Sequence, residues 1–254
     1  MKNLLIFILI FLFSFLQCQE IIKVDYETIS NPKISLAGSG NLSENMKEEI
    51  KAKALQGAKK PKKFVLFYNQ GNSFFYRNIQ DENSYSEKQK IEYFRFSNKD
   101  GIYVLNDFIV DKFYGYYPMN NVNIEFVNET QTIENYNCKL AIYKIGNTTS
   151  KVWYTEDIPI SAGPYNYYKV PGLILKIESL NFLCYAVNIS KVLDDKDIRN
   201  MDSDLKVYEG EELNSKIQIG LSQLRNHNQQ KFESKKEVAS WKKMSDETTK
   251  KASK

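Results

Sequence analysis

Residues 153–175 read WYTEDIPISAGPYNYYKVPGLIL, and they predict a sharp corner between two β-strands. Proline cannot donate a hydrogen bond to a neighbouring strand, so Ile158-Pro159 should end the first strand. Gly163-Pro164 and Pro171-Gly172 are residue pairs that favour turns. The apolar run 173–175 should then begin a buried second strand. The loop between the two strands carries three tyrosines: Tyr165, Tyr167 and Tyr168.

Two interpretations of this corner follow from the residues alone. In the first, the turns and prolines only define the fold, and the tyrosines fill space around the corner. In the second, the tyrosine-bearing loop forms the rim of a binding site, because ligand pockets are commonly lined by aromatic side chains with a few polar groups. A second aromatic segment, 113–118, is the densest in the chain and adds three candidate ligand-binding residues: Tyr114, Tyr116 and Tyr117.

Short aromatic and β-branched runs on both sides of the corner predict further strands, because turn residues separate them at regular intervals. Such spacing is typical of an antiparallel meander. The fold class is therefore α+β, mainly antiparallel β, with a curved meander sheet or a half-open barrel. The expected strands are 64–68, 74–76, 91–96, 102–105, 108–114, 122–127, 139–144, 151–154, 173–178 and 183–187, with Asn147 and Thr148 in a hairpin.

Two helical segments complete the predicted fold. One N-terminal amphipathic helix is indicated by apolar residues at every fourth position, with Asn41 or Ser43 as its cap and Gly57 and Pro61 at its end. Residues 213–254 contain no proline and predict a C-terminal helix that passes into a lysine-rich, partly disordered tail. The expected organisation is a signal peptide (1–18), a β-rich domain (19–205) and the C-terminal helix and tail (206–254). The recurring helical residues are Leu42, Met46, Ile50 and Ala54.

The first residues predict export. Lys2 precedes an apolar run from residue 4 to 16, a length within the roughly 7–15 residues of a signal-peptide core and short for a membrane span. A polar, charged segment follows, so we expect cleavage near Cys18-Gln19 and a location in the periplasm or cell envelope. The alternative is a lipid anchor on Cys18, although lipoproteins normally place Gly, Ala or Ser before that cysteine and Gln17 stands there.

After cleavage, Cys138 and Cys184 are the remaining cysteines. An oxidising compartment permits a disulfide between them, which would stabilise the fold by roughly 4 kcal/mol in the chain-entropy model. The alternative is two buried free thiols. Neither cysteine lies in a CxxC pattern, which argues against a redox-active pair.

Composition and charge exclude several function classes. The 254-residue chain has a net charge of +4, but residues 231–254 alone carry eight lysines against four acidic residues, so the main body is close to neutral. No basic stripe is left there for nucleic acid. The single histidine, His227, lies in a polar segment, which argues against histidine-dependent catalysis. The sequence indicates no metal site, no cofactor and no catalytic residue.

The corner resembles one family, the GLPGLI family of exported proteins from Bacteroidetes-type bacteria. Its pattern is a Y-x-C segment, then W-[YF]-T-x-x-I-P-[IV]-x-x-G-P, then G-L-P-G-L-I. Residues 136–138 match the first part and residues 153–164 match the second throughout. The third part reads KVPGLI at 169–174, so Lys169 and Val170 depart from it. The matching motif residues are Trp153, Tyr154, Thr155, Ile158, Pro159, Gly163, Pro164, Pro171, Gly172, Leu173 and Ile174.

Lys169 in the place of a glycine suggests either a backbone angle that does not demand glycine or a shifted turn. The resemblance implies an envelope protein without a catalytic signature and names no activity. We therefore expect a non-enzymatic binder of an apolar or peptide-like ligand or of an outer-membrane protein. The alternatives are a structural or assembly module without a small ligand and a carboxylate-dependent hydrolase.

Overall fold

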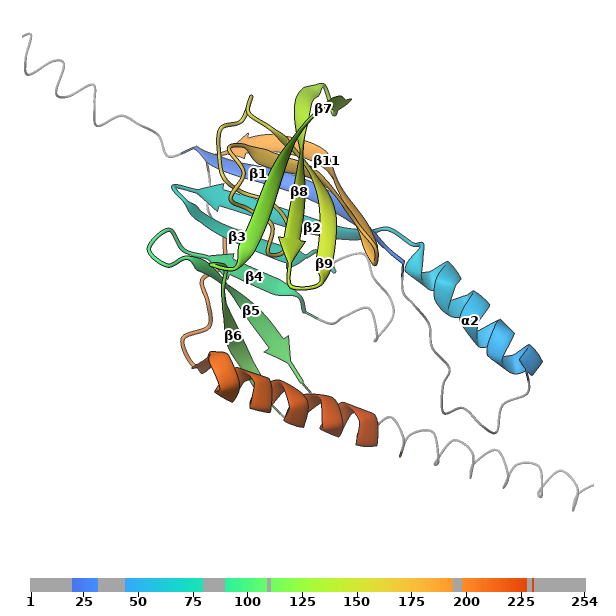
Figure 1. The fold of residues 1–254 in the computed structure, drawn as a ribbon. Helices are drawn as coiled ribbons and strands as arrows, with labels where there is room; N and C mark the ends of the chain where they lie inside the picture. The colour runs from blue at the N-terminus through green and yellow to red at the C-terminus, as the bar shows by residue number, and fades with distance from the viewer. Residues whose placement is uncertain are drawn as a thin grey trace, which may run out of the picture. The chain divides into compact units, whose positions relative to one another are not determined.

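The computed structural model describes residues 20–31, 44–79, 90–108, 111–193, 198–227 and 230 (Figure 1). The predicted signal peptide with Cys18, the capping residues Asn41 and Ser43, and the tail beyond residue 230 lie outside the described residues. Within the described ranges, no helix is long and apolar enough to cross a membrane.

The described chain is mainly antiparallel β-sheet, as predicted. Its strands are β1 (Ile21–Ser30), β2 (Lys62–Asn69), β3 (Asn72–Arg77), β4 (Glu92–Arg95), β5 (Gly101–Asp107), β6 (Lys112–Pro118), β7 (Val122–Ile133), β8 (Tyr136–Ile145), β9 (Thr148–Thr155), β10 (Leu173–Ser179), β11 (Phe182–Val192) and β12 (Val207–Tyr208). They are hydrogen-bonded in the order β12-β6-β5-β4-β3-β2-β1-β11-β10-β9-β8-β7, so the sheet is open and not a closed barrel.

Strand β1 is the junction between two meanders. Strands β2 to β6 follow one another on one side of it, and β11 back to β7 follow one another on the other. Tyr26 of β1 lies opposite Phe64 of β2 and Ala186 of β11, and both pairings are antiparallel. The Tyr26 hydroxyl also donates a buried hydrogen bond of 2.6 Å to the carbonyl oxygen of Ile174 on β10.

One expected strand, 108–114, is misplaced. The chain turns there: β5 ends at Asp107, the Phe108 amide donates to the Asp111 carbonyl at 2.9 Å, and β6 begins at Lys112. Residues 112–114 of the expected strand belong to β6, whereas Phe108 and Asp111 lie between β5 and β6. The expected hairpin at Asn147 is confirmed, since Gly146, with φ of 54°, and Asn147 connect β8 to β9.

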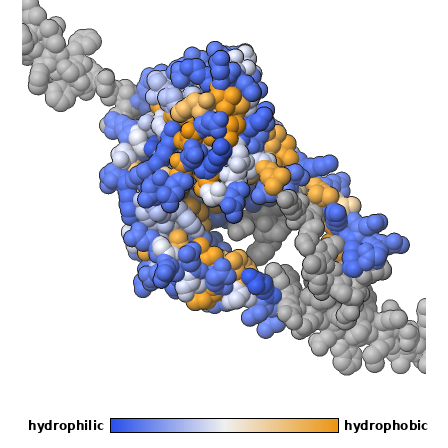
Figure 2. Space-filling view, in the orientation of Figure 1, coloured by the Kyte–Doolittle hydropathy of each residue, from blue (hydrophilic) through white to orange (hydrophobic). Residues whose placement is uncertain are grey.

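The predicted N-terminal helix is α2 (Glu44–Ala58), and it ends before Pro61 as expected. Its apolar positions are only partly covered: Met46 is 50% exposed and Ile50 is 42% exposed. Ion pairs along the helix, such as Lys53–Glu49 at 2.6 Å, support it locally. Figure 2 shows hydrophilic residues over most of the visible face of α2.

The predicted disulfide is wrong. Cys138 and Cys184 are buried free thiols. Cys138 on β8 and Cys184 on β11 are separated by β9 and β10, and three strand spacings amount to roughly 14 Å. A disulfide requires Cα atoms within about 7 Å. Burial raises the pKa of Cys138 to about 11 and that of Cys184 to about 12, so both thiols are protonated at neutral pH.

The structure groups the chain into two compact units. The first comprises Met1–Tyr103 and Pro118–Met201, and the second comprises Val104–Tyr117 and Asp202–Lys254. The second unit contains a helix over residues 210–227, which is the predicted C-terminal helix. Within this unit, Lys216 of the helix donates to Asp111 at 2.9 Å and lies 5.1 Å from the centre of the Tyr208 ring.

The main core lies in the first unit and includes the corner. Trp153, Tyr154 and Thr155 of β9 are buried, and so are Leu173 and Ile174 of β10. These motif residues fill the core, as the architectural interpretation of the corner expects. Gly172 is needed there because an added Cβ would overlap the Thr155 carbonyl oxygen and lie 2.6 Å from its carbonyl carbon.

We predict that Gly172→Ala lowers the free energy of unfolding by at least about 2 kcal/mol, because the backbone of β9 cannot give way without losing strand hydrogen bonds. Urea denaturation measures the loss. Gly57→Ala in α2 is the matched control: no atom lies within 4 Å of the added Cβ, so its unfolding energy should be unchanged or slightly raised. Equal effects of the two substitutions would contradict the close approach at Gly172.

Candidate ligand-binding site

The corner loop between β9 and β10 is closed by its own backbone. The Leu173 amide donates to the Ile158 carbonyl at 3.0 Å, and the Ile174 amide donates to the Ala162 carbonyl at 2.9 Å. Ala162 and Leu173 also form an isolated parallel bridge. These hydrogen bonds hold the two ends of the loop together, so the residues between them start from fixed backbone positions.

Two non-glycine residues of this loop have left-handed backbone angles: Tyr165 with φ of 58° and Lys169 with φ of 67°. Such angles cost of order 1 kcal/mol or more for a residue with a Cβ, and they persist only where surrounding contacts enforce them. Lys169 therefore has the backbone angle that favours glycine. One expectation from the sequence is that Lys169 has a backbone angle that does not demand glycine, and this expectation is wrong.

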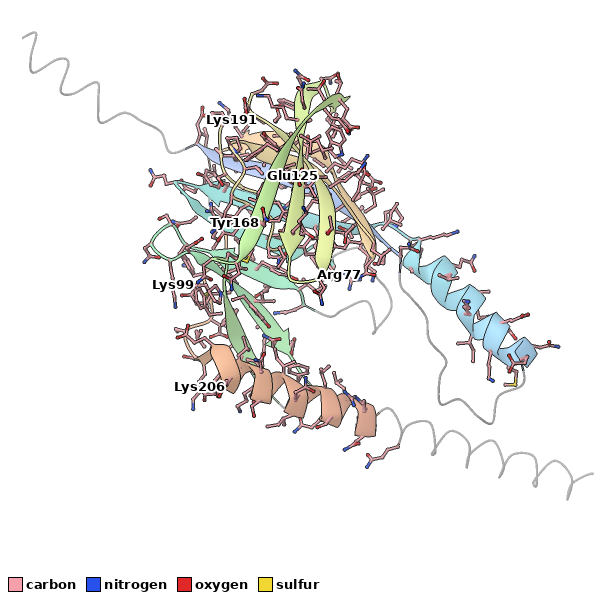
Figure 3. All side chains as sticks on the ribbon, viewed as in Figure 1. Arg77, Lys99, Glu125, Tyr168, Lys191 and Lys206 are labelled. Atoms are coloured by element: carbon pink, nitrogen blue, oxygen red, sulfur yellow. The ribbon has the colours of Figure 1, made fainter. Side chains whose placement is uncertain are left out.

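Side-chain contacts fix Lys169 and its neighbour Tyr168. Lys169 Nζ donates to Asp100 Oδ2 at 2.7 Å and to the Met119 carbonyl at 2.8 Å, while the Tyr168 hydroxyl donates to Asp100 Oδ1 at 2.7 Å. The Arg95 guanidinium lies 4.7 Å from the centre of the Tyr168 ring. Figure 3 shows Tyr168 among the side chains of the sheet. The hydrogen bond from Lys169, and then that from Tyr168, lowers the pKa of Asp100 below its ordinary value.

Tyr165 lies at the centre of an aromatic cluster. Its ring centre is 4.9 Å from that of Phe75, 5.2 Å from that of Phe182 and 5.6 Å from that of Tyr93. The Tyr93 and Phe75 contacts are edge-to-face, a favourable geometry for aromatic pairs. The Tyr165 hydroxyl donates to Thr28 Oγ1 at 2.9 Å, and burial raises the pKa of Tyr165 well above its ordinary value.

Tyr167 adds a second anchored ring. It is 6% exposed, its hydroxyl lies 2.9 Å from Ser150 Oγ, and its ring centre is 6.4 Å from that of Phe182. Tyr165 and Tyr167 therefore meet at Phe182 from the same loop. Both rings are held by one hydroxyl contact and by ring packing, so little side-chain freedom remains to be lost on binding.

The tyrosine hollow is the cavity beside these two rings, with a volume of about 330 Å³. Among the described residues that line it, none is charged. The walls are aromatic rings, side-chain hydroxyls and two amides. The lining residues are Thr28, Ser30, Tyr93, Tyr165, Asn166, Tyr167, Asn181 and Phe182.

The structure therefore brings together Tyr165 and Tyr167 of the six predicted ligand-binding residues. Tyr168 packs next to Arg95 and does not line the hollow. Tyr114, Tyr116 and Tyr117 belong to the second unit. Tyr114 is 2% exposed and its hydroxyl accepts a hydrogen bond from the Asp202 amide at 3.1 Å; Tyr116 is 6% exposed. Tyr114 and Tyr116 are therefore core and not rim in their own unit, whereas Tyr117 is half-buried.

Sequence reasoning missed the other side of the hollow. Thr28 and Ser30 come from β1, and Tyr93 comes from β4. Asn181 comes from the β10–β11 connection, and Phe182 is the first residue of β11. Only the strand pairing brings these segments to the corner loop. No local sequence pattern distinguishes them, because the residue types found on the half-exposed face of a strand are the same whether or not that face borders a cavity.

No cluster of potential metal ligands is present among the described residues. Glu156 and Asp157 are both exposed, and Glu156 accepts from Lys139 at 2.6 Å. His227 is exposed near the end of the helix in the second unit. The described part of the site thus offers ring faces and neutral hydrogen-bonding groups rather than acid–base or metal chemistry.

Comparison with known proteins gives one family model and a set of similar structures. The family described as "N-glycanase peptide, N-terminal domain" matches residues 107–215. None of the curated proteins matches the chain. Two solved structures of PNGF-II are similar in fold: the one in space group C2 has 15% identity and a TM-score of 0.49, and the one in P21 has 16% identity and a TM-score of 0.48. The matches cover 75% of this chain and 31% and 32% of those chains, so this chain spans about a third of their length.

We predict that Lys169→Gly is about 1 kcal/mol more stable than Lys169→Ala. Both variants lose the bonds to Asp100 and Met119, but only glycine relieves the left-handed backbone angle. Relative to the wild type, Lys169→Gly should be close to neutral, since a partly exposed ion pair is worth about 0.2–1 kcal/mol. Thermal and urea unfolding of the three proteins measure the order. Equal stability of the two variants would contradict the backbone argument.

We further predict that Lys169→Ala raises the pKa of Asp100 toward its ordinary value, and that Tyr168→Phe raises it less, because the lysine makes the larger contribution. The folded-state pKa lies below the unfolded one, so this interaction stabilises the fold at neutral pH and its contribution is lost as the pH falls through the folded-state pKa. Carboxyl NMR titration of the three proteins measures the order. An unchanged pKa in Lys169→Ala would contradict the assignment.

Proposed function

We propose that this protein is an exported, non-enzymatic binding module of the cell envelope that holds an uncharged, ring-shaped ligand in the tyrosine hollow. The observation that carries the proposal is the lining of the hollow, in which rings supply the area and neutral groups supply the hydrogen bonds. A volume of about 330 Å³ is at the lower end of ligand pockets, which span roughly 300–1,000 Å³, and suits one or two rings.

A sugar ring of a glycan is the ligand that this lining favours. One side of a pyranose presents C–H groups, which pack on the negative faces of aromatic rings. Its hydroxyl groups need donors and acceptors without net charge, and the amides of Asn166 and Asn181 and the hydroxyl of Ser30 provide both. A charged or long apolar ligand would leave these groups unsatisfied or exposed.

The family match supports the same ligand class. The matching model describes the N-terminal domain of an N-glycanase, a protein whose name refers to glycans attached through nitrogen. We transfer only the ligand class to this chain. The tyrosine hollow has no acidic lining residue in the described chain, whereas glycoside hydrolysis uses two carboxylates about 5–9 Å apart. Carbohydrate binding without cleavage is therefore the proposed role.

Export and family assignment are part of the proposal. The apolar segment behind Lys2 supports a location in the periplasm or cell envelope after cleavage near Cys18-Gln19. Membership of the GLPGLI family is supported by the corner motif and by the angle at Lys169, where the family pattern has a glycine and φ is 67°. An outer-membrane protein that carries or presents the ligand is the proposed partner.

A structural or assembly role is the second candidate. It is favoured by Phe126, which is 57% exposed on β7, the strand at one end of the sheet. Figure 2 shows apolar residues at the surface on the side where Figure 1 places β7. A module of this kind would act through the sheet edge and would leave the tyrosine hollow empty.

The test uses N,N′-diacetylchitobiose, the disaccharide with which N-linked glycans begin, titrated into the isotopically labelled protein. We expect saturable NMR shifts at Tyr165, Tyr167 and Phe182, with a Kd on the order of 1 mM for so small a ligand. Asn181→Ala should weaken binding about three- to tenfold, the usual effect of one lost hydrogen bond.

Asn147→Ala is the matched control, because Asn147 is an exposed residue of the β8–β9 turn and does not line the hollow. It should bind like the wild type. Shifts with N-acetylphenylalanine amide and none with the sugar would assign the peptide-like ligand instead. The absence of shifts with either probe would move the assignment to the assembly role.

A further inference from the structure

Strands β2, β3 and β4 carry a second set of aromatic side chains on the face opposite the tyrosine hollow. Side chains alternate along a strand, so Phe75 and Tyr93 face the hollow while their neighbours Phe74 and Phe94 face the other way. The register places Phe67 opposite Phe74, and Phe74 opposite Phe94. One row of phenylalanines therefore crosses three adjacent strands.

The rings of this row are nearly parallel. The centres of Phe74 and Phe94 are 4.7 Å apart with an angle of 21° between the planes, and those of Phe74 and Tyr76 are 4.9 Å apart with an angle of 15°. Tyr76 also stacks on Phe67, with ring centres 6.4 Å apart, so ring contacts run from Phe67 through Tyr76 to Phe74 and Phe94. Phe67, Phe74 and Phe94 are only 2–3% exposed, so a further ring can pack against them only from within a cavity.

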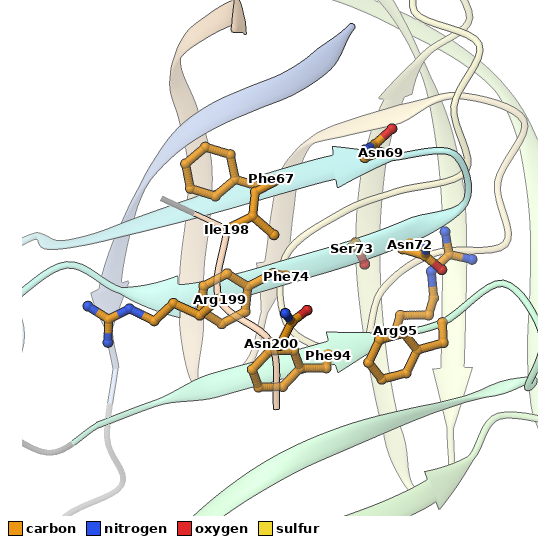
Figure 4. Close-up of a pocket in the computed structure, with 11 residues that line it drawn as sticks. Phe67, Asn69, Asn72, Ser73, Phe74, Phe94, Arg95, Ile198, Arg199 and Asn200 are labelled. Carbon is orange, nitrogen blue, oxygen red and sulfur yellow. The ribbon is translucent and has the colours of Figure 1, made fainter. Parts of the chain in front are cut away.

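A cavity of about 240 Å³ lies between this row and residues 198–200 (Figure 4). We call it the phenylalanine cleft. It is smaller than the roughly 300–1,000 Å³ of pockets for drug-sized ligands, so its occupant has about one ring. The lining residues are Phe67, Asn69, Asn72, Ser73, Phe74, Phe94, Arg95, Phe96, Ile198, Arg199 and Asn200.

The charge of the lining separates this cleft from the tyrosine hollow. Its charged lining residues in the described chain are Arg95 and Arg199, and no acidic residue lines it. Figure 4 shows them on opposite sides of the phenylalanine row. Arg95 is held in place, since its Nη2 donates to the Ser161 carbonyl at 3.0 Å and its guanidinium lies over the Tyr168 ring.

Arg199 has donors to spare. Its side chain is 63% exposed, and its ion-pair partner, Glu92, lies 4.0 Å away, which is too long for a charge-assisted hydrogen bond. A guanidinium has five N–H donors in a planar fork that matches a carboxylate.

We propose that the phenylalanine cleft is a second ligand site, which binds a carboxylate carried on a single ring. The ring packs against Phe74 and Phe94, and the carboxylate accepts hydrogen bonds from Arg199. The site is independent of the tyrosine hollow, because the two cavities share no lining residue and lie on opposite faces of the same strands.

The test compares three probes by NMR titration of the full chain. Phenylacetate has both the ring and the charge, phenylacetamide has the ring alone, and acetate has the charge alone. We expect saturable shifts at Phe74, Phe94 and Arg199 with phenylacetate. Binding should be at least about tenfold weaker for phenylacetamide, which loses the charge-assisted contact, and for acetate, which loses the ring packing. D-glucuronate presents a carboxylate on a sugar ring, and tighter binding of it would support the site and assign a carbohydrate source.

Two variants give opposite predictions. Arg199→Gln should weaken phenylacetate about tenfold and leave phenylacetamide unchanged. Glu92→Gln should tighten phenylacetate, because it removes the acidic group that lies 4.0 Å from Arg199. Arg225→Gln, an exposed arginine of the second unit, is the matched control and should change nothing. A merely structural role of Arg199 would not give opposite effects in the first two variants.

Equal binding of phenylacetate and phenylacetamide, or shifts at Tyr165 and Phe182 instead of the phenylalanine row, would overturn the proposal. So would the absence of saturable shifts with phenylacetate and D-glucuronate. The tyrosine hollow is tested separately, by titration with a neutral sugar, so failure of that proposal and failure of this one are distinguishable.

Discussion

The pairing of β1 with both β2 and β11 is the constraint on which the rest of the fold depends. Each meander pairs internally between consecutive strands, but β1 joins the two, and its partners on either side are far apart in the sequence. The hydrogen bond from Tyr26 to the Ile174 carbonyl then connects β1 to the strand that leaves the corner. The corner loop thereby meets β1 and β4, and the tyrosine hollow forms where these segments meet.

Alternation of side chains allows one group of strands to build two different cavities. On β2 to β4, the residues that face the corner loop complete the aromatic cluster around Tyr165, while their neighbours form the phenylalanine row. The chemistry of the two faces differs because of what covers them. The corner loop adds tyrosines and amides to one face, and residues 198–200 add Arg199 to the other.

The corner also illustrates how local strain is balanced by long-range contacts. Tyr165 and Lys169 adopt backbone angles that cost energy for residues with a Cβ. Four ring contacts and the bond to Thr28 hold Tyr165, and the bonds to Asp100 and Met119 hold Lys169. Lys169 thus adopts a backbone angle that favours glycine, and its side chain makes contacts with Asp100 and Met119 that a glycine would lack.

The sequence by itself determined the fold class, most of the strands, the two helices and the corner, because strand and turn preferences are properties of short segments. It also placed Tyr165 and Tyr167 on the corner loop, and both residues line the tyrosine hollow. Only the tertiary structure decided that Cys138 and Cys184 are too far apart for a disulfide, that Tyr114 is core, and that Thr28 and Phe182 complete the hollow. These outcomes depend on which distant strands pair and in what register, and that choice is made by burying one continuous core rather than by any local pattern.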